Sequence, residues 1–174
     1  MRIISGSHKG RKIQMPNNLE VRPTTDRAKE SLFNILQNRY VLDNKCVLDL
    51  FAGSGNISYE FFSRGCSPVT SVDINKKCVL FIKSQIKQLE ININIIHEDA
   101  TKFIRKNNKK FDFIFLDPPY IFKYYNELKD LIIEKNIINK GGCLIIEHDK
   151  NTSFNDYNVE LKKYGSVYFS IFSF

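Results

Sequence analysis

From residue 46 onward, the chain alternates short apolar runs with longer stretches in which apolar residues recur every three or four positions. Short runs of this kind are typical of buried strands, and the longer stretches are typical of amphipathic helices. The alternation therefore predicts an α/β fold built on a mostly parallel sheet. The predicted strands cover residues 46–51, 69–74, 92–96, 111–116 and 143–147, and the predicted helices cover residues 56–63, 76–89, about 100–106 and 124–135.

The C-terminal residues depart from this alternation. Residues 159–164 and 167–174 lie on either side of Gly165-Ser166 and predict an antiparallel hairpin at an edge of the sheet. The expected sheet thus has seven strands, mostly parallel, with an antiparallel C-terminal hairpin. The pattern contains no internal repeat and no low-complexity linker.

The first 40 residues have a pattern of their own. Two short apolar pieces, Ile3-Ile4 and residues 13–15, predict a small hairpin. Thr24 or Thr25 can cap a helix that should end near residue 38. We therefore predict an N-terminal hairpin and helix over residues 1–40, followed by a main domain over residues 41–174.

The charge adds a partner class to this picture. A formal net charge of +7 and a pI near 9.2 favour a polyanionic partner such as nucleic acid, although a solvated basic surface is the alternative. The tip of the predicted N-terminal hairpin carries Lys9, Arg11 and Lys12 beside two glycines, and these cations are candidate phosphate contacts. An ordinary exposed basic turn would look the same. Arg27, at the start of the next helix, is a candidate from its position alone.

The four cysteines show no C-x-x-C spacing and no histidine at metal-ligand spacing beside them. We expect them to act as small apolar residues in a reducing compartment, and we expect no metal. The N-terminus turns polar after a few residues, and no apolar run reaches the ~18 residues of a membrane span. A cytoplasmic protein without a membrane partner is therefore expected.

Four acids stand at or just after the ends of successive predicted strands: Asp49, Asp73, Asp99 and Asp117. The carboxyl ends of parallel strands meet at one edge of a sheet, so we expect these side chains to line one crevice. Asp73 lies 20 residues after Gly53, an offset at which an acid meets a ribose hydroxyl in nucleotide-binding βαβ units.

The turn after the first strand contains Gly53 and Gly55, which let a ligand approach the backbone closely. It does not match the dinucleotide fingerprint, because Ser58 stands at the third glycine position, and it lacks the Lys of a phosphate-binding loop. A carboxylate at Asp49 would repel pyrophosphate and attract an amino group. The turn therefore favours a nucleoside without phosphates, and a purely structural tight turn is the alternative.

The fourth predicted strand ends in Asp117-Pro118-Pro119-Tyr120. Proline has no amide hydrogen and restricts the residue before it, so Asp117 should be held in an extended pose beyond the strand. Its carboxylate and the Pro118 carbonyl can both accept hydrogens from one exocyclic amino group, and Tyr120 can stack on a planar base. The alternative is a rigid turn followed by a core tyrosine.

This motif, together with residues 49–55 (DLFAGSG), resembles the class I S-adenosylmethionine-dependent methyltransferases that act on amino groups. Residues 22–27 (RPTTDR), preceded by Ile-Ile-Ser-Gly and Lys-Gly-Arg-Lys, are more specific and resemble the bacterial RsmD family. That family methylates the N2 amine of one guanine in 16S ribosomal RNA. The resemblance covers nearly the whole chain and implies a Rossmann-like class I methyltransferase fold whose first 40 residues bind RNA.

The resemblance also implies roles for matching residues. The methionine part of the cofactor would lie on Asp49 and the following turn, its ribose on Asp73 and its adenine between Ile74 and Asp99. The target guanine would be held by Asp117, Pro118 and Tyr120. The residues implied for cofactor binding are Asp49, Phe51, Ala52, Gly53, Gly55, Asp73, Ile74, Asp99 and Ala100, and the residues implied for RNA binding are Lys9, Arg11, Lys12, Arg22 and Arg27.

Two features differ from the family. Asp73 stands where the family often has the longer Glu, which should shift the ribose contact slightly without changing its chemistry. The part of the chain after Gly142 matches only in its pattern, so the sequence offers no site residue there.

The expected partner is 16S ribosomal RNA, within a small ribosomal subunit or an assembly intermediate, and we expect a monomer. Three alternatives stay open. A DNA adenine-N6 methyltransferase would share the Asp-Pro-Pro-Tyr motif, but usually needs a target-recognition domain for which the chain has no room. A protein glutamine methyltransferase would leave the basic N-terminal loop without a purpose. A non-catalytic RNA-binding module would have no need of the intact acids.

Overall fold

The computed structural model describes residues 1–174 with the exception of residues 17, 18, 20, 22, 120 and 157. The described residues form a seven-stranded sheet in the order β3-β2-β1-β4-β5-β7-β6. The strands are β1 (Val47–Leu50), β2 (Val69–Asp73), β3 (Ile93–His97), β4 (Phe111–Leu116), β5 (Ile138–His148), β6 (Val159–Tyr164) and β7 (Val167–Ser173). The helices are α1 (Asp26–Arg39), α2 (Asn56–Ser63), α3 (Lys76–Leu89), α4 (Ala100–Lys106) and α5 (Tyr125–Glu134).

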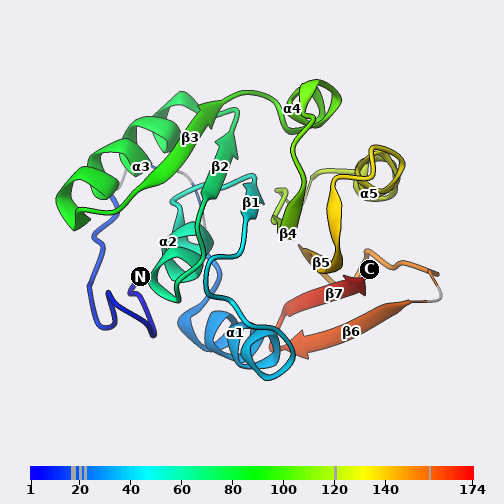
Figure 1. Cartoon of the computed structure of the whole chain (residues 1–174), viewed down its shortest axis with the longest axis horizontal. Helices are drawn as coiled ribbons and strands as arrows, with labels where there is room; N and C mark the ends of the chain where they lie inside the picture. Colours follow the sequence, from blue (N-terminus) through cyan, green and yellow to red (C-terminus); the bar gives the residue numbers. More distant parts are fainter. Residues whose placement is uncertain (17–18, 20, 22, 120, 157) are drawn as a thin grey trace.

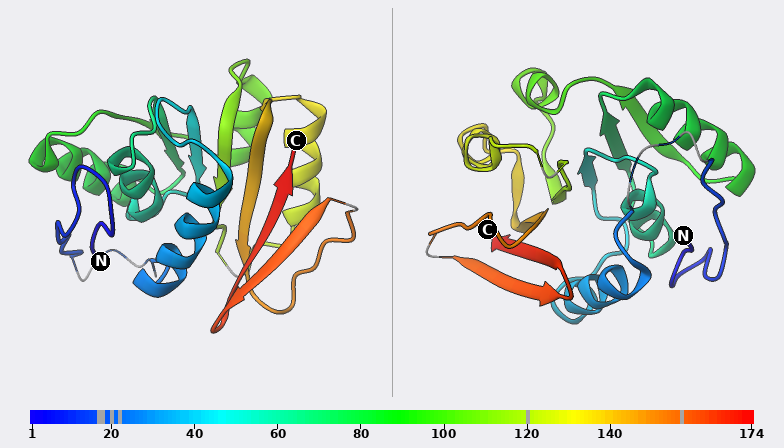
Figure 2. Two further views of the ribbon diagram at one scale, coloured as in Figure 1. Left: turned by 60° about the horizontal axis from the view of Figure 1, so that its bottom comes forward. Right: turned by 180° about the vertical axis from the view of Figure 1, so that it is seen from behind.

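Strands β1 to β5 are parallel, and β7 runs antiparallel between β5 and β6. The predicted fold class, a mostly parallel seven-stranded α/β sheet with an antiparallel C-terminal hairpin, is confirmed. Helices α1, α2 and α3 cover one face of the sheet and α4 and α5 cover the other (Figures 1 and 2). The alternation of side chains along a strand explains this, because Phe113 and Phe115 of β4 pack in one core while Ile114 and Leu116 pack in the other.

The periodicity of the sequence predicted most element boundaries to within one residue, with β5 as the exception. We predicted its start at Cys143, but it begins at Ile138 and includes Gly141-Gly142. The register between β4 and β5 shifts between Phe111 and Phe113, so the glycines lie in an irregular stretch of a strand. A Cβ at Gly142 would come within 2.4 Å of the Asp112 carbonyl oxygen, which explains why only glycine fits there.

The N-terminal hairpin is smaller than predicted. It consists of one antiparallel bridge between Arg2 and Lys12, and Ile3 N donates to Arg11 O at 3.0 Å beside it. Ile3 and Ile13 anchor this loop because both are buried in the core that contains α1. Thr25 caps α1 by accepting a hydrogen bond from Ala28 N, whereas Thr24 is buried and serves a different purpose.

A buried ion cluster attaches the N-terminal segment to α2. Glu60 pairs with Arg64 at 2.7 Å and with Lys29 at 3.4 Å, and all three side chains are almost fully inaccessible to solvent. The same carboxylate accepts hydrogen bonds from the backbone amides of Ile4 and Ser5 at 2.8 and 3.1 Å. Burial lowers the pKa of Lys29, and the charge of Glu60 opposes that shift.

Within the described part of the chain, no helix is long and apolar enough to cross a membrane.

We predict that Glu60→Gln destabilises the protein by about 3–5 kcal/mol, because the substitution leaves two buried cations without a counter-charge. Urea unfolding at pH 7 measures the change in the free energy of unfolding. The control Glu134→Gln removes an exposed carboxylate from α5 and should change that free energy by less than ~0.5 kcal/mol. Similar effects of the two substitutions would contradict the importance of the cluster.

Candidate active site

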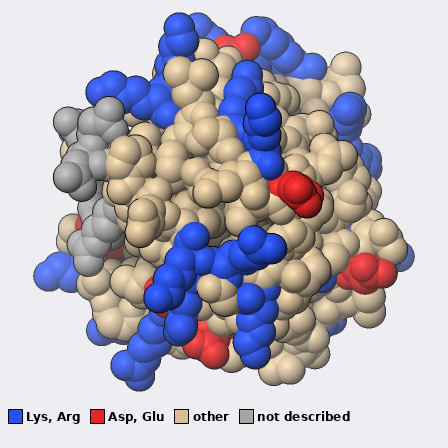
Figure 3. Space-filling model, turned by 90° about the vertical axis from the view of Figure 1, so that its left-hand side faces the viewer, with Lys and Arg blue, Asp and Glu red and all other residues tan. Residues whose placement is uncertain are grey.

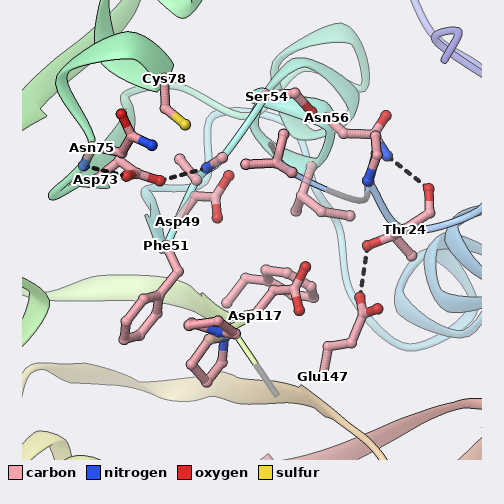
Figure 4. A pocket seen from close by; sticks show the side chains of 18 of the residues that line it. Thr24, Asp49, Phe51, Ser54, Asn56, Asp73, Asn75, Cys78, Asp117 and Glu147 are labelled. Atoms are coloured by element: carbon pink, nitrogen blue, oxygen red, sulfur yellow. Dashed lines mark hydrogen bonds between the residues drawn. The ribbon is translucent and has the colours of Figure 1, made fainter. Parts of the chain in front are cut away.

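A cavity of about 400 Å³ opens at the carboxyl edge of the sheet. Its wall is formed by the turn after β1, the ends of β2, β4 and β5, the first residues of α2 and α3, and the segment that precedes α1 (Figure 4). Open parallel sheets bind their ligands at this edge. The predicted crevice is therefore present as a cavity, and the sequence-predicted residues can be placed relative to it.

Asp117 lies directly after β4 and points into the cavity, and Pro118 and Pro119 continue the wall. Burial raises the pKa of Asp117 well above its ordinary value, and the nearby carboxyl groups of Glu147 and Asp49 raise it further. Tyr120, which we predicted to stack on the target base, lies outside the described residues. Asp117 is thus an acid in an environment that disfavours its own charge.

Asp49 lies within β1 and is only 1% exposed. Its carboxylate accepts a hydrogen bond from the Ser58 hydroxyl, which also contacts the Ser71 hydroxyl at 2.6 Å. Ser58 is the residue that breaks the dinucleotide fingerprint, and its hydroxyl serves here to orient an acid. Burial raises the pKa of Asp49 to about 7, despite the hydrogen bond from Ser58.

The turn after β1 has a left-handed backbone at three of its residues, with φ of 63° at Phe51, 54° at Gly53 and 78° at Gly55. Gly53 lines the cavity, where its amide donates to Asp73 Oδ2 at 2.7 Å. Gly55 has a structural role, because a Cβ there would come within 2.6 Å of the Tyr59 ring. The turn therefore exposes backbone to a ligand while a carboxylate from β2 fixes its shape.

Asp73 ends β2 and uses both carboxylate oxygens locally, since Oδ1 accepts from Asn75 N at 2.7 Å and Oδ2 accepts from Gly53 N. Ile74 follows it in the cavity wall and is 65% exposed. Phe51 and Ala52 line the same wall. These positions agree with the cofactor-binding residues implied by the sequence, although their roles stay predictions.

Asp99 and Ala100 lie outside the wall of the cavity, so the prediction that all four strand-end acids line one crevice is wrong for Asp99. Asp99 caps α4 by accepting a hydrogen bond from Lys102 N at 2.9 Å, and Ala100 is buried in the first turn of that helix. The amide of the neighbouring Glu98 donates a hydrogen bond to the Asp73 carbonyl, which keeps Asp99 and Ala100 close to the end of β2. Their predicted contacts with adenine stay predictions.

Glu147 is a site residue that the sequence analysis missed. It lies near the end of β5, lines the cavity and is 5% exposed. Thr24 Oγ1 donates to Glu147 Oε2 at 2.6 Å, and burial raises the pKa of Glu147 despite this bond. The signal was available, because Glu147 is one more acid at the end of a predicted parallel strand.

Four of the predicted RNA-binding residues, Lys9, Arg11, Lys12 and Arg27, lie away from the cavity wall. The fifth, Arg22, lies outside the described residues. Lys9, Arg11 and Lys12 are exposed on the N-terminal loop, and Arg27 is exposed in the first turn of α1. The face that carries this loop and α3 displays many Lys and Arg side chains and few acids (Figure 3). Helix α3 contributes the exposed residues Lys76, Lys77, Lys83 and Lys87.

The chemistry of the cavity wall defines the ligand that it fits. Its described ionisable side chains include the acids Asp49, Asp73, Asp117 and Glu147, and no Lys or Arg. Apolar side chains such as Phe51 and Ile74 form much of the remaining surface. Clustered acids without a cation favour a ligand that carries positive charge and hydrogen-bond donors, together with a planar or apolar part.

Comparison with solved structures assigns the class. A proposed methyltransferase from Escherichia coli matches this structure with a TM-score of 0.85 and 25% identity, over 99% of this chain and 96% of that one. The strand order and the site at the carboxyl edge agree with this match. The protein has the class I methyltransferase fold.

Comparison with protein families identifies its relatives. The model of the family described as Conserved hypothetical protein 95 matches residues 1–173. Ribosomal RNA small subunit methyltransferase D of Buchnera aphidicola from Acyrthosiphon pisum is 40% identical over 87% of this chain and 79% of that protein. The protein of the same name from Escherichia coli K12 is 33% identical over 86% of this chain and 75% of that protein. The chain therefore belongs to the family of this model and of these relatives, which is the RsmD family of methyltransferases.

We predict that the free energy of unfolding falls as the pH rises, by roughly 2–4 kcal/mol from Asp49 alone. The folded-state pKa of about 7 lies above the unfolded value near ~4, so the native state binds the extra proton between them and loses this stability as pH rises toward 7. Asp49→Asn keeps an acceptor for Ser58 and should flatten the profile in urea unfolding between pH 5 and 8. The control Glu30→Gln, an exposed change on α1, should leave the profile unchanged, and an unaltered slope in Asp49→Asn would contradict the assignment.

Proposed function

We propose that this protein transfers a methyl group from S-adenosylmethionine to the exocyclic N2 amine of a guanine in 16S ribosomal RNA. The observation that carries the proposal is the position of Asp117, which lies between the carboxyl end of β4 and Pro118 and faces an acid-lined cavity. Membership of a methyltransferase family supports methyl transfer, and the relatives named for the small ribosomal subunit support ribosomal RNA as the substrate. The Asp-Pro-Pro-Tyr motif supports only a planar amino nitrogen as the methyl acceptor, and the choice of the guanine N2 amine rests on the basic N-terminal segment and the resemblance to the RsmD family.

The residues of the cavity fit the proposed cofactor. S-adenosylmethionine supplies a methyl group on a positively charged sulfur, and it also carries an ammonium group, a ribose and an adenine. Asp49 would accept from the ammonium group, and Asp73 would accept from the ribose hydroxyls with the lone pairs that Gly53 and Asn75 leave free. Exposed Ile74 would cover one face of the adenine. Asp99 and the Ala100 amide are the proposed contacts at its edge.

Asp117 would act on the other reactant. Its carboxylate and the Pro118 carbonyl would each accept one N–H of the target amine, which aims the lone pair of the nitrogen at the cavity. Holding the two reacting atoms in line supplies much of the acceleration expected for such a transfer. The proton of the amine can leave after the methyl group has arrived, so Asp117 would act as an orienting acceptor more than as a strong base. Tyr120 would stack on the base.

The RNA would approach over the basic face. Lys9, Arg11, Lys12, Arg22 and Arg27 are the proposed phosphate contacts, and the exposed lysines of α3 extend the same charge (Figure 3). An amine inside a cavity of this kind must come from an unpaired or flipped base. We expect a monomeric cytoplasmic protein that acts on a small subunit or an assembly intermediate, with residues 1–40 serving RNA binding.

The rival functions make different predictions for nucleosides. A DNA adenine methyltransferase would leave ribosomal RNA unchanged and alter DNA, and a protein glutamine methyltransferase would alter neither nucleic acid. A non-catalytic RNA-binding module would not bind S-adenosylmethionine at all. Mass-spectrometric mapping of nucleosides therefore separates all of them from the proposed function.

We predict that cells lacking this protein lose one N2-methylguanosine from 16S ribosomal RNA and that the wild-type gene restores it. Asp117→Ala should fail to restore it while the purified variant still binds S-adenosylmethionine in calorimetry, because only the acceptor for the amine is lost. The variant should also fold, since it removes a carboxyl group whose charge is disfavoured by burial. An unchanged nucleoside map, or full restoration by Asp117→Ala, would contradict the proposal.

We predict that replacing Lys9, Arg11 and Lys12 together with Gln weakens RNA binding and lowers the slope of log K against log salt by about 2–3, since each phosphate contact contributes about 0.7–0.9. Filter binding of 16S ribosomal RNA between 50 and 300 mM salt measures the slope. A charge-matched control replaces the exposed Lys140, Lys150 and Lys163 of the C-terminal part and should change the slope by less than ~1. Equal slopes for the two triple variants would remove the N-terminal loop from the RNA interface.

A further inference from the structure

We propose that Glu147 is a second acceptor for the target base and restricts the site to guanine. Asp117 would hold the N2 amine, and Glu147 would accept the N1–H beside it. This inference rests on the proposed function and assigns a chemical role to a residue for which the sequence resemblance supplied none.

The sheet places the two carboxyl groups side by side. Leu116 of β4 pairs with Ile146 of β5 in parallel register, so Asp117 and Glu147 follow paired positions. Neighbouring strands lie ~4.8 Å apart and paired residues share a face, so both side chains point to the same side of the sheet. Both line the cavity and point into it (Figure 4).

A chain of hydrogen bonds orients Glu147. Thr24 Oγ1 donates to its Oε2 at 2.6 Å, and the Thr24 carbonyl accepts from Asn56 Nδ2 at 2.9 Å. Asn56 Oδ1 accepts in turn from the buried Lys29 Nζ at 2.7 Å. Within the described part of the chain, Glu147 Oε1 has no hydrogen-bond partner. One oxygen of Glu147 is therefore fixed by the protein, and the other is available to a ligand.

The donor pattern of the base explains the selectivity. Guanine presents the N2 amine and the adjacent N1–H, which are both donors. Adenine and cytosine present their amine beside a ring nitrogen that is an acceptor. Two donors in a row complement the carboxyl groups of Asp117 and Glu147, and their hydrogen bonds would favour the ionised acceptor forms that burial alone disfavours, whereas a ring nitrogen facing an ionised Glu147 would leave two acceptors in contact. A site built to receive an N–H discriminates strongly against an analogue that lacks it, because a buried polar group is then left unpaired.

A purely structural role for Glu147 makes a different prediction. If Glu147 only anchors Thr24, its replacement would slow methylation of every base analogue by the same factor. The base 2-aminopurine separates the two roles because it keeps the C2 amine of guanine but has an acceptor at N1. The informative quantity is the ratio of the transfer rates for guanine and 2-aminopurine at one position.

The experiment uses small subunits reconstituted with 16S ribosomal RNA that carries either guanine or 2-aminopurine at the nucleotide identified by the nucleoside map. Methyl transfer from labelled S-adenosylmethionine is measured under single-turnover conditions with the full-length wild-type protein, Glu147→Gln and the exposed control Glu134→Gln. We expect the wild type and the control to favour guanine by about 10-fold or more, as a lost buried hydrogen bond predicts. Glu147→Gln should reduce this ratio by about 10-fold, because its amide can donate to N1 of 2-aminopurine.

A second variant guards against misfolding of the first. Thr24→Val keeps the carboxylate but removes its anchor, so it should also lower the ratio while retaining transfer to guanine. Equal guanine to 2-aminopurine ratios in the wild type and both variants, or equal wild-type rates for the two bases, would overturn the role of Glu147. Absence of any wild-type transfer to the guanine amine would instead overturn the proposed function, so the two failures are distinguishable.

Discussion

The buried carboxylate of Glu60 is the interaction on which the arrangement of the site depends. It neutralises Lys29 and Arg64 in the core and accepts hydrogen bonds from two backbone amides of the N-terminal segment. Lys29 continues the network to Asn56, and Asn56 continues it to the carbonyl of Thr24. A residue outside the cavity wall therefore fixes the segment that forms part of that wall. Buried charges of this kind favour one geometry because each alternative arrangement would leave a buried charge without a partner.

The acids of the cavity show which features of the site can be predicted from the positions of the strand ends. Parallel topology correctly predicted that Asp49, Asp73 and Asp117 would converge, because the rule depends only on strand direction. It could not predict which polar groups each acid would meet. The carboxylate of Asp99 caps a helix, and that of Asp49 is held by Ser58. Both contacts depend on side-chain distances that a linear pattern does not contain.

Other features were out of reach for a more basic reason. The contact between Thr24 and Glu147 spans 123 residues, and no local pattern encodes it. Lys29 looks like a solvated residue on an amphipathic helix, yet it is fully buried. The early start of β5 was missed because Gly141-Gly142 is typical of a turn, whereas here the glycines relieve a close backbone approach within a strand. The helices, by contrast, follow from periodicity and capping residues, so their boundaries were predicted closely.

The attachment of the N-terminal loop to α2 has a consequence for substrate selection. A Cβ at Gly6 would come within 1.7 Å of the Ser63 carbonyl oxygen, and the same oxygen accepts from Ser7 N at 2.7 Å, while Ser63 Oγ accepts from His8 N. The loop is thus mounted on the helix that begins at the glycine turn. The distance between the cations of the loop and the cavity is therefore fixed by this attachment. In the proposed complex, a nucleotide whose base enters the cavity would lie at a fixed distance from the phosphates bound by the loop, so the shape of the RNA would contribute to substrate selection in addition to the identity of the base.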